Sequence, residues 1–177
     1  MISYILALLT GALLFGADRY TKILTVAANP SGPTGESKQI IKGLIDFTYV
    51  RNGGAAWGMM SGKTWLLISV TGVVMLACIA LLLKYGSKHK LLFWAISIVL
   101  FGGLGNMYDR IFYGGEVVDF IHFTFMPKFP VFNIADCGVV IGAALLILYF
   151  VIDMIRENRS KSRLSMAALE NDEDGKS

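Results

Sequence analysis

Residues Gly102–Phe120 read GGLGNMYDRIFYGGEVVDF, and a second segment, Phe129–Asp136, reads FPVFNIAD. Each segment carries an aspartate next to apolar residues, Asp119 in the first and Asp136 in the second. An ionisable residue inside an apolar segment is costly and is by default a candidate for function, with a second one nearby as its natural partner. The two aspartates are therefore the first candidates for a functional pair, and the rest of the chain is interpreted around them.

The composition indicates a membrane protein. The chain has 177 residues, of which 55% are hydrophobic and only 16% are charged, and its formal net charge is +3. Soluble domains carry about 25% charged residues. The two cysteines, Cys78 and Cys137, and the two histidines, His89 and His122, form no spaced motif. The sequence therefore predicts no metal site, no cofactor and no nucleic-acid partner.

Four apolar segments are long enough to cross a bilayer, which takes about 20 residues of helix. They cover residues 2–24, 64–83, 91–108 and 131–152. The first is interpreted as a retained helix, because it lacks the basic start of a cleaved signal peptide. The prediction is a mainly helical membrane protein with a single four-helix domain over residues 1–155. A charged, disordered tail is expected over residues 156–177.

Basic residues in the short connections predict how the helices are oriented. Lys84, Lys88 and Lys90 lie around the link between the second and third segments. Four more follow the last segment: Arg156, Arg159, Lys161 and Arg163. Because such residues favour the cytoplasmic side, both termini and the tail are expected in the cytoplasm. Four aspartates then converge on the outer side: Asp18, Asp109, Asp119 and Asp136.

The connections on the outer side have patterns of their own. Residues Leu44–Arg51 (LIDFTYVR) alternate in the manner of a β-strand, and Asn52-Gly53-Gly54 is typical of a turn. These features predict a small β-sheet on the outer surface. Residues Phe120–Phe132 are rich in aromatic side chains and contain two prolines, which predicts a segment at the lipid–water interface.

A pair of adjacent carboxyl groups can share a proton and act together as acid and base. Asp136 is expected in the first turn of the last helix, where the helix dipole favours its anion. Asp119 has more apolar neighbours, which favours the neutral acid. The hypothesis is that Asp136 starts as the base and Asp119 as the acid of a coupled pair.

Five blocks of this sequence resemble, in the same order, the motifs of bacterial lipoprotein signal peptidase, or signal peptidase II. The blocks are Asp18–Lys22, Asn52–Gly58, Gly105–Arg110, Val117–Phe120 and Phe132–Asp136. The resemblance extends over about residues 1–156 and implies an aspartic endopeptidase of the bacterial cytoplasmic (inner) membrane. Such an enzyme removes the signal peptide from prolipoproteins whose cysteine already carries diacylglycerol, and globomycin-type compounds inhibit it. The implied catalytic pair is Asp119 and Asp136.

The resemblance also implies roles for other polar residues. Four of them would hold the substrate backbone or order the catalytic pair: Asn52, Asn106, Arg110 and Asn133. A turn residue and a helix cap are the structural interpretations of Asn52 and Asn133. Asp18 and Lys22 are four residues apart, which predicts a salt bridge on one helix face, and Asp109 is interpreted as partly structural. The active site is expected to face outward, and the protein to act as a monomer in contact with membrane lipid.

Two positions depart from the family pattern. Arg19 stands where glutamine is common, and Cys137 stands where serine is common. Two other functions remain open from the residues alone. A small transporter or channel could use the carboxylates to bind protons or ions, although no internal repeat supports it. A non-enzymatic assembly protein would tolerate Asp119→Asn without effect.

Overall fold

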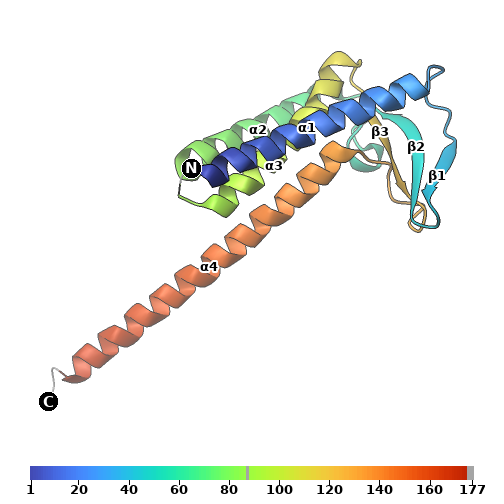
Figure 1. The fold of residues 1–177 in the computed structure, drawn as a ribbon. Coiled ribbons are helices and arrows are strands. Elements are labelled where there is room, and N and C mark those ends of the chain that lie inside the picture. The colour runs from blue at the N-terminus through green and yellow to red at the C-terminus, as the bar shows by residue number, and fades with distance from the viewer. Residues whose placement is uncertain (87, 175–177) are drawn as a thin grey trace.

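The computed structural model describes residues 1–86 and 88–174, in which four long helices carry a small sheet at one end (Figure 1). The helices are α1 (Ile2–Ala28), α2 (Thr64–Tyr85), α3 (Lys90–Phe112) and α4 (Ile134–Asp174). All four are long and apolar enough to cross a membrane, α4 over Ile134–Arg163. The predicted four-helix architecture is thereby confirmed.

The helices extend further than hydropathy alone predicts. α3 continues past residue 108 through Asp109 to Phe112, because Asp109 is paired with Lys22 inside the protein, and α1 continues from residue 24 to Ala28. α4 continues past Arg156 to Asp174, so the backbone predicted to be disordered is helical as far as it is described. Glu157 and Lys161 form an i,i+4 ion pair at 2.7 Å, and no glycine or proline interrupts the sequence before Gly175. Residues 175–177 of the predicted tail lie outside the described residues.

α3 lies at the centre of the helices and contacts the other three. Glycines allow α3 and α4 to approach closely at two levels. A Cβ atom at Gly102 would lie 2.7 Å from the carbonyl oxygen of Ala135, and one at Gly142 would lie 2.9 Å from that of Ala95. Such small residues let helix backbones pack against each other where lipid gives no hydrophobic driving force. This packing fixes the start of α4 against α3.

The sheet is antiparallel with strand order β1-β2-β3, formed by β1 (Ser37–Ile41), β2 (Ile45–Asn52) and β3 (Val117–Phe123). β2 confirms the strand predicted over residues 44–51. The segment predicted to be interfacial is corrected in its first part, because Phe120–Phe123 belongs to β3. These aromatic and β-branched residues pair with β2, from which the sequence separates them by about 70 residues.

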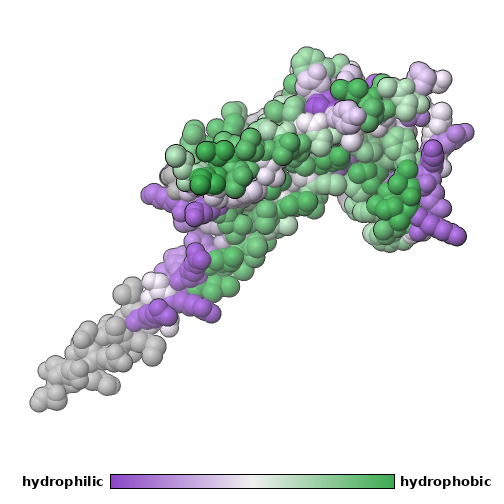
Figure 2. Space-filling view, in the orientation of Figure 1, coloured by the Kyte–Doolittle hydropathy of each residue, from purple (hydrophilic) through white to green (hydrophobic). Residues whose placement is uncertain are grey.

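The sheet lies at the end of the helices opposite the N-terminus and the α2–α3 link (Figure 1). Hydrophobic residues cover most of the visible helix surface, whereas hydrophilic residues gather at the outer edge of the sheet, near the α2–α3 link and on the stretch of α4 that follows its hydrophobic part (Figure 2). Tyr49, Val118 and Phe120 form a small core that packs against Val26 of α1 and Ile134 of α4. This core joins the sheet to the helix ends where the predicted site residues lie.

Candidate active site

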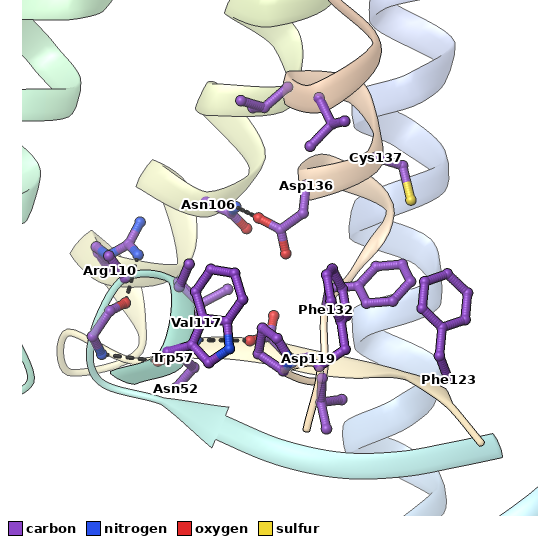
Figure 3. A pocket seen from close by; sticks show the side chains of 18 of the residues that line it. Asn52, Trp57, Asn106, Arg110, Val117, Asp119, Phe123, Phe132, Asp136 and Cys137 are labelled. Carbon is purple, nitrogen blue, oxygen red and sulfur yellow. Dashed lines mark hydrogen bonds between the residues drawn. The ribbon is translucent and has the colours of Figure 1, made fainter. Parts of the chain in front are cut away.

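Asp119 and Asp136 come from different elements and point toward one another (Figure 3). Asp119 lies on β3 and is only 2% exposed, and Asp136 is the third residue of α4 and is half-buried. β3 is held by its pairing with β2, and the start of α4 is held by its packing on α3. The fold therefore brings together the two residues that the sequence singled out.

Each of the four oxygen atoms of this pair accepts a hydrogen bond from an amide N–H. Asp119 accepts from the side chains of Asn133, at 2.5 Å, and Asn52, at 3.1 Å. Asp136 accepts from the side chain of Asn106 at 2.6 Å and from the backbone of Asn133 at 3.1 Å. Neutral amides can fix a carboxyl group in place without supplying a permanent counter-charge. Three asparagines thus order the pair, which is one of the two roles that the resemblance implies for them.

Asn133 and Asn52 each combine a structural contact with a contact to the pair. Asn133 caps α4, because its side-chain oxygen accepts from the backbone N–H of Asp136 at 2.9 Å. Asn52 forms a turn, because its side-chain oxygen accepts from the backbone N–H of Gly54 at 2.9 Å. The turn and the cap are therefore both present, and each of these residues also contacts a carboxyl group of the pair.

Arg110 reaches the pair through the loop that follows β2. Its Nη2 donates to the carbonyl oxygen of Gly54 at 3.0 Å, while Gly54 donates to Asn52 and Asn52 donates to Asp119. Three consecutive hydrogen bonds therefore connect α3 to one carboxyl group of the pair. Arg110 also lines the cavity in front of the pair, where it is available to a bound molecule.

The pKa of Asp119 is raised from its ordinary value of 3.8 to about 7, mainly because the group is buried and secondly because the charge of Asp136 is nearby. The hydrogen bonds from Asn52 and Asn133 oppose this shift, because they stabilise the ionised form. At neutral pH a large fraction of Asp119 carries its proton. The electrostatics therefore agree with the hypothesis that Asp119 is the acid of the pair.

The two aspartates lie at the polar end of a cavity of about 640 Å³. Its walls are formed by Asn52, residues 54–57, Asn106, Arg110, Val117, Phe123, residues 129–132, Cys137 and residues 139–141. The rings of Trp57 and Phe129 meet edge-to-face beside it, with centroids 6.0 Å apart. A mainly apolar cavity with a few convergent polar groups is the usual form of a small-ligand or substrate site. This one suits an extended apolar molecule with a polar bond at its carboxylate end.

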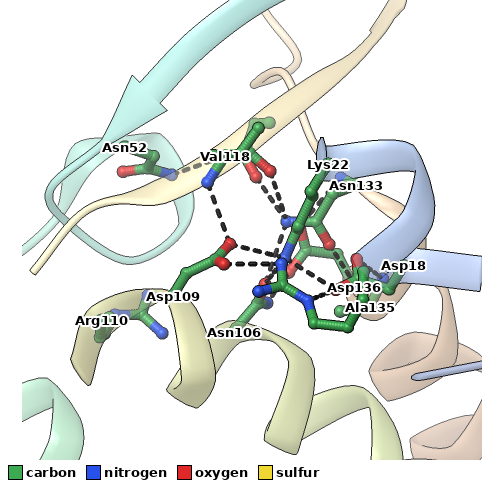
Figure 4. Close-up of polar contacts among 12 residues, drawn as sticks. Asp18, Lys22, Asn52, Asn106, Asp109, Arg110, Val118, Asn133, Ala135 and Asp136 are labelled. Carbon is green, nitrogen blue, oxygen red and sulfur yellow. Dashed lines mark hydrogen bonds and ion pairs between the residues drawn. The ribbon is translucent and has the colours of Figure 1, made fainter. Parts of the chain in front are cut away.

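Behind the pair lies a buried group of charges, named here the ion cluster, formed by Asp18, Arg19, Lys22 and Asp109 (Figure 4). Lys22 lies 3.0 Å from Asp18, as their spacing predicts, and 2.9 Å from Asp109. Arg19 lies 2.6 Å from Asp109. Sequence reasoning assigned no role to Arg19, although a charge within an apolar helix was the signal that could have singled it out.

Comparison with known proteins identifies the fold and the reaction class. Residues 10–152 match the family described as signal peptidase (SPase) II. A lipoprotein signal peptidase from Clostridium acetobutylicum is 46% identical over 115 residues, which cover 64% of this chain and 74% of that protein. One from Halalkalibacterium halodurans is 34% identical over 163 residues, which cover 92% of this chain and 99% of that protein.

Solved structures agree with these relatives. A bacterial membrane enzyme determined by the in meso method at 2.3 Å resolution superposes with a TM-score of 0.76 at 34% identity, over 84% of this chain and 88% of the other. A second, determined at 1.9 Å, gives a TM-score of 0.71, also at 34% identity, over 81% of this chain and 91% of the other. These matches favour a peptidase over the transporter and the assembly protein. The chain is a multi-pass membrane protein that belongs to the signal peptidase II family.

Proposed function

We propose that this protein is an aspartic endopeptidase that cleaves the signal peptide from prolipoproteins immediately before a diacylglyceryl-modified cysteine. Asp119 and Asp136 are its catalytic pair. One observation carries the assignment of residues: two carboxyl groups from different elements, each oxygen bonded to an amide, face one another at the polar end of an apolar cavity. Membership of the family supports the reaction and the substrate class.

In the proposed reaction one aspartate takes a proton from the attacking water while the other gives a proton to the peptide carbonyl. Ionised Asp136 takes a proton from a water molecule, whose oxygen attacks the carbonyl carbon, while neutral Asp119 donates its proton to the carbonyl oxygen. In the second step the tetrahedral intermediate returns a hydroxyl proton to Asp119, and Asp136 gives its proton to the leaving nitrogen as the C–N bond breaks. Both groups end in their starting forms. The raised pKa of Asp119 supports its part in the first step.

The apolar cavity wall supports a lipid-modified substrate. Phe123, Phe129 and Phe132 lie on the sheet side of the cavity, and Val140 and Ile141 lie on α4. Acyl chains and the apolar residues of a signal peptide would lie against this wall, and burial of each methylene group contributes about 0.8 kcal/mol. Globomycin-type inhibitors are proposed to occupy the same cavity.

The proposed location is the bacterial cytoplasmic (inner) membrane, with the active site facing outward and both termini in the cytoplasm. Lys84, Lys88 and Lys90 support this orientation, because they lie around the α2–α3 link at the end opposite the sheet. The protein is proposed to act as a monomer and without a cofactor, since all groups in the proposed reaction come from one chain.

The test is cleavage of a fluorogenic peptide that carries a diacylglyceryl cysteine. Asp119→Asn and Asp136→Asn are each expected to lower kcat by about 10³-fold or more, because each removes a group that moves a proton. Asp153→Asn is the matched control, since Asp153 is an exposed aspartate of the same helix α4. All variants are checked for folding by thermal unfolding in detergent. Retained turnover in either site variant would reject this pair.

A further inference from the structure

We propose that the ion cluster positions the catalytic pair by holding the backbone immediately before each aspartate. In this proposal Asp18 positions Asp136, Asp109 positions Asp119, and Lys22 joins the two contacts. The inference rests on the proposed function of the pair. It assigns to these residues a positioning role, not contact with the reacting atoms.

The first contact joins α1 to the start of α4. Oδ1 of Asp18 accepts a hydrogen bond from the backbone N–H of Ala135 at 3.0 Å, and neither residue is exposed. Ala135 directly precedes Asp136 and lies in the first turn of α4, where backbone N–H groups have no partner within the helix. A carboxylate there is also favoured by the helix dipole. Asp18 therefore fixes the position of the helix turn that carries Asp136.

The second contact joins α3 to β3. Oδ2 of Asp109 accepts a hydrogen bond from the backbone N–H of Val118 at 3.2 Å, and Val118 is 1% exposed. Val118 directly precedes Asp119, and successive side chains of a strand point to opposite faces. Holding Val118 by its backbone while its side chain packs on Tyr49 and Phe120 fixes the direction in which Asp119 points.

Lys22 connects these contacts to each other and to the pair. Its Nζ lies 3.0 Å from Oδ2 of Asp18, 2.9 Å from Oδ2 of Asp109 and 3.0 Å from Oδ1 of Asn106. Asn106 in turn donates to Asp136 (Figure 4). With Arg19 bound to Asp109, two cations balance two carboxylates, and all of these residues except the partly exposed Arg19 are buried. Lys22 is therefore the member of the cluster that both contacts share, whereas Asp18 and Asp109 each hold one backbone segment.

General stabilisation does not require this arrangement. Buried ion pairs are often no more stabilising than apolar residues of the same size, so a cluster of four charges is weak evidence for a role in stability alone. What distinguishes this cluster is which backbone groups its carboxylates contact. Its two carboxylates bind the two backbone N–H groups that directly precede the two residues of the pair.

Because each carboxylate contacts a different backbone N–H group, removing one of them should change hydrogen exchange at its own contact and not at the other. The full chain in detergent micelles is labelled with ¹⁵N, and hydrogen exchange is measured at the amides of Val118 and Ala135. Asp109→Ala is expected to speed exchange at Val118 by about tenfold or more, with Ala135 within about threefold of wild type. Asp18→Ala is expected to do the reverse, and Lys22→Met to speed exchange at both amides. Asp153→Ala is the control and is expected to change neither.

Turnover of the lipidated peptide gives the second readout. Each of the three cluster variants is expected to lower kcat by about tenfold or more while KM stays within about threefold, because the reacting groups are displaced while the cavity is kept. Asp109→Asn and Asp18→Asn retain an acceptor oxygen, so each is expected to restore slow exchange at its own amide. If an alanine variant fails to fold, exchange and turnover of the asparagine variants are still measured and test the proposal.

The inference is overturned if single variants speed exchange equally at both amides, if kcat is unchanged, or if the asparagine variants exchange as fast as the alanine variants. Exchange is measured without turnover, so the two hypotheses fail separately. Full activity of Asp119→Asn would reject the proposed catalytic pair, whereas the exchange rates would still decide whether the cluster holds the two backbone segments.

Discussion

The side-chain oxygen of Asn133 accepts a hydrogen bond from the backbone N–H of Asp136 at 2.9 Å, and Oδ2 of Asp136 accepts one from the backbone N–H of Asn133 at 3.1 Å. This reciprocal pair is a capping box, in which the first residue of a helix and the residue three positions later satisfy each other. The amide nitrogen of Asn133 also donates to Asp119. One residue therefore caps α4 and contacts both members of the proposed catalytic pair.

Asn133→Ser is expected to separate these roles. Serine keeps a capping oxygen but has no amide nitrogen for Asp119, so the free energy of unfolding should change by only about 1 kcal/mol. Asp119 becomes negatively charged as it gives up its proton, and loss of a hydrogen bond to a charged group, about 1.5–3 kcal/mol, should lower kcat by roughly 10- to 100-fold. Peptide cleavage and thermal unfolding measure the two effects. Asn133→Ala, which also removes the cap, is the comparison, and wild-type turnover of the serine variant would contradict the expected role.

Gly54→Ala is expected to disrupt the loop that links Arg110 to Asn52. A Cβ atom at Gly54 would lie 2.7 Å from backbone atoms of Gly58 and Met59. Overpacking of this kind costs about 1–3 kcal/mol, and here it displaces the turn that holds Asn52. Gly53→Ala is the matched control, since its Cβ would meet the side chains of Ser61 at 3.6 Å and Glu116 at 4.0 Å, which are ordinary contacts. In cleavage assays Gly54→Ala should lose much of its activity and Gly53→Ala little. Equal activities of the two variants would argue against a role for the hydrogen bonds that link Arg110 to Asn52.

Gly105→Ala is expected to push α3 away from the ion cluster. Its Cβ would lie 2.7 Å from Oδ2 of Asp18 and 3.0 Å from the Cβ of Ala135, so the free energy of unfolding should fall by about 1–3 kcal/mol. Gly103 lies on the same helix, and its Cβ would meet only Met75 at 3.8 Å. Gly103→Ala should be neutral or stabilising by about 0.5–1 kcal/mol, because alanine favours helix. Thermal unfolding in one detergent compares them, and the reverse order of stability would refute the packing argument.

The stability of the protein is expected to depend on pH through Asp119. Its pKa is about 7 in the folded protein against an ordinary value of 3.8, so between these values the folded chain retains a proton that the unfolded chain has lost. The contribution of Asp119 to the free energy of unfolding is therefore largest below about pH 4. It falls as the pH rises to about 7, by at most about 1.4 kcal/mol per pH unit. Asp119→Asn removes the decline.

The measurement is the melting temperature of wild type and Asp119→Asn from pH 4 to pH 8. The melting temperature of Asp119→Asn should rise relative to that of the wild type as the pH increases. That of Asp153→Asn should change with pH in the same way as that of the wild type. A constant difference between wild type and Asp119→Asn would show that the carboxyl group titrates near its ordinary pKa.

The sequence predicts the helices and one strand well, because long apolar runs and local alternation are local signals. It underestimates the length of α3, since the last turn of that helix contains Asp109, whose charge is neutralised only in the folded protein, and it ends α1 four residues early. β1 and β3 were not predicted as strands. β1 is exposed along its whole length and shows no alternation, and β3 was interpreted as a motif and an interfacial segment. Their pairing with β2 is a property of the folded chain.

Within the site, sequence spacing predicts the Asp18–Lys22 pair and the cap by Asn133, but not what else these residues contact. The bond from Ala135 to Asp18 joins positions 117 residues apart, and the bond from Asn52 to Asp119 joins positions 67 apart. Backbone N–H groups also carry no sequence signature. The sequence therefore names the two aspartates and the asparagines that contact them, but it does not predict the hydrogen bonds that hold these residues in place.

The occupancy of the carboxylate oxygens limits what can compete with substrate. Each oxygen has two lone pairs, and an amide N–H already uses one on all four atoms. The positions that remain accept hydrogen atoms, so a tight inhibitor should present hydroxyl or ammonium donors toward the pair and attach them to an apolar body. At the pair itself, compounds that offer only acceptors would find one complementary hydrogen, the proton on Asp119.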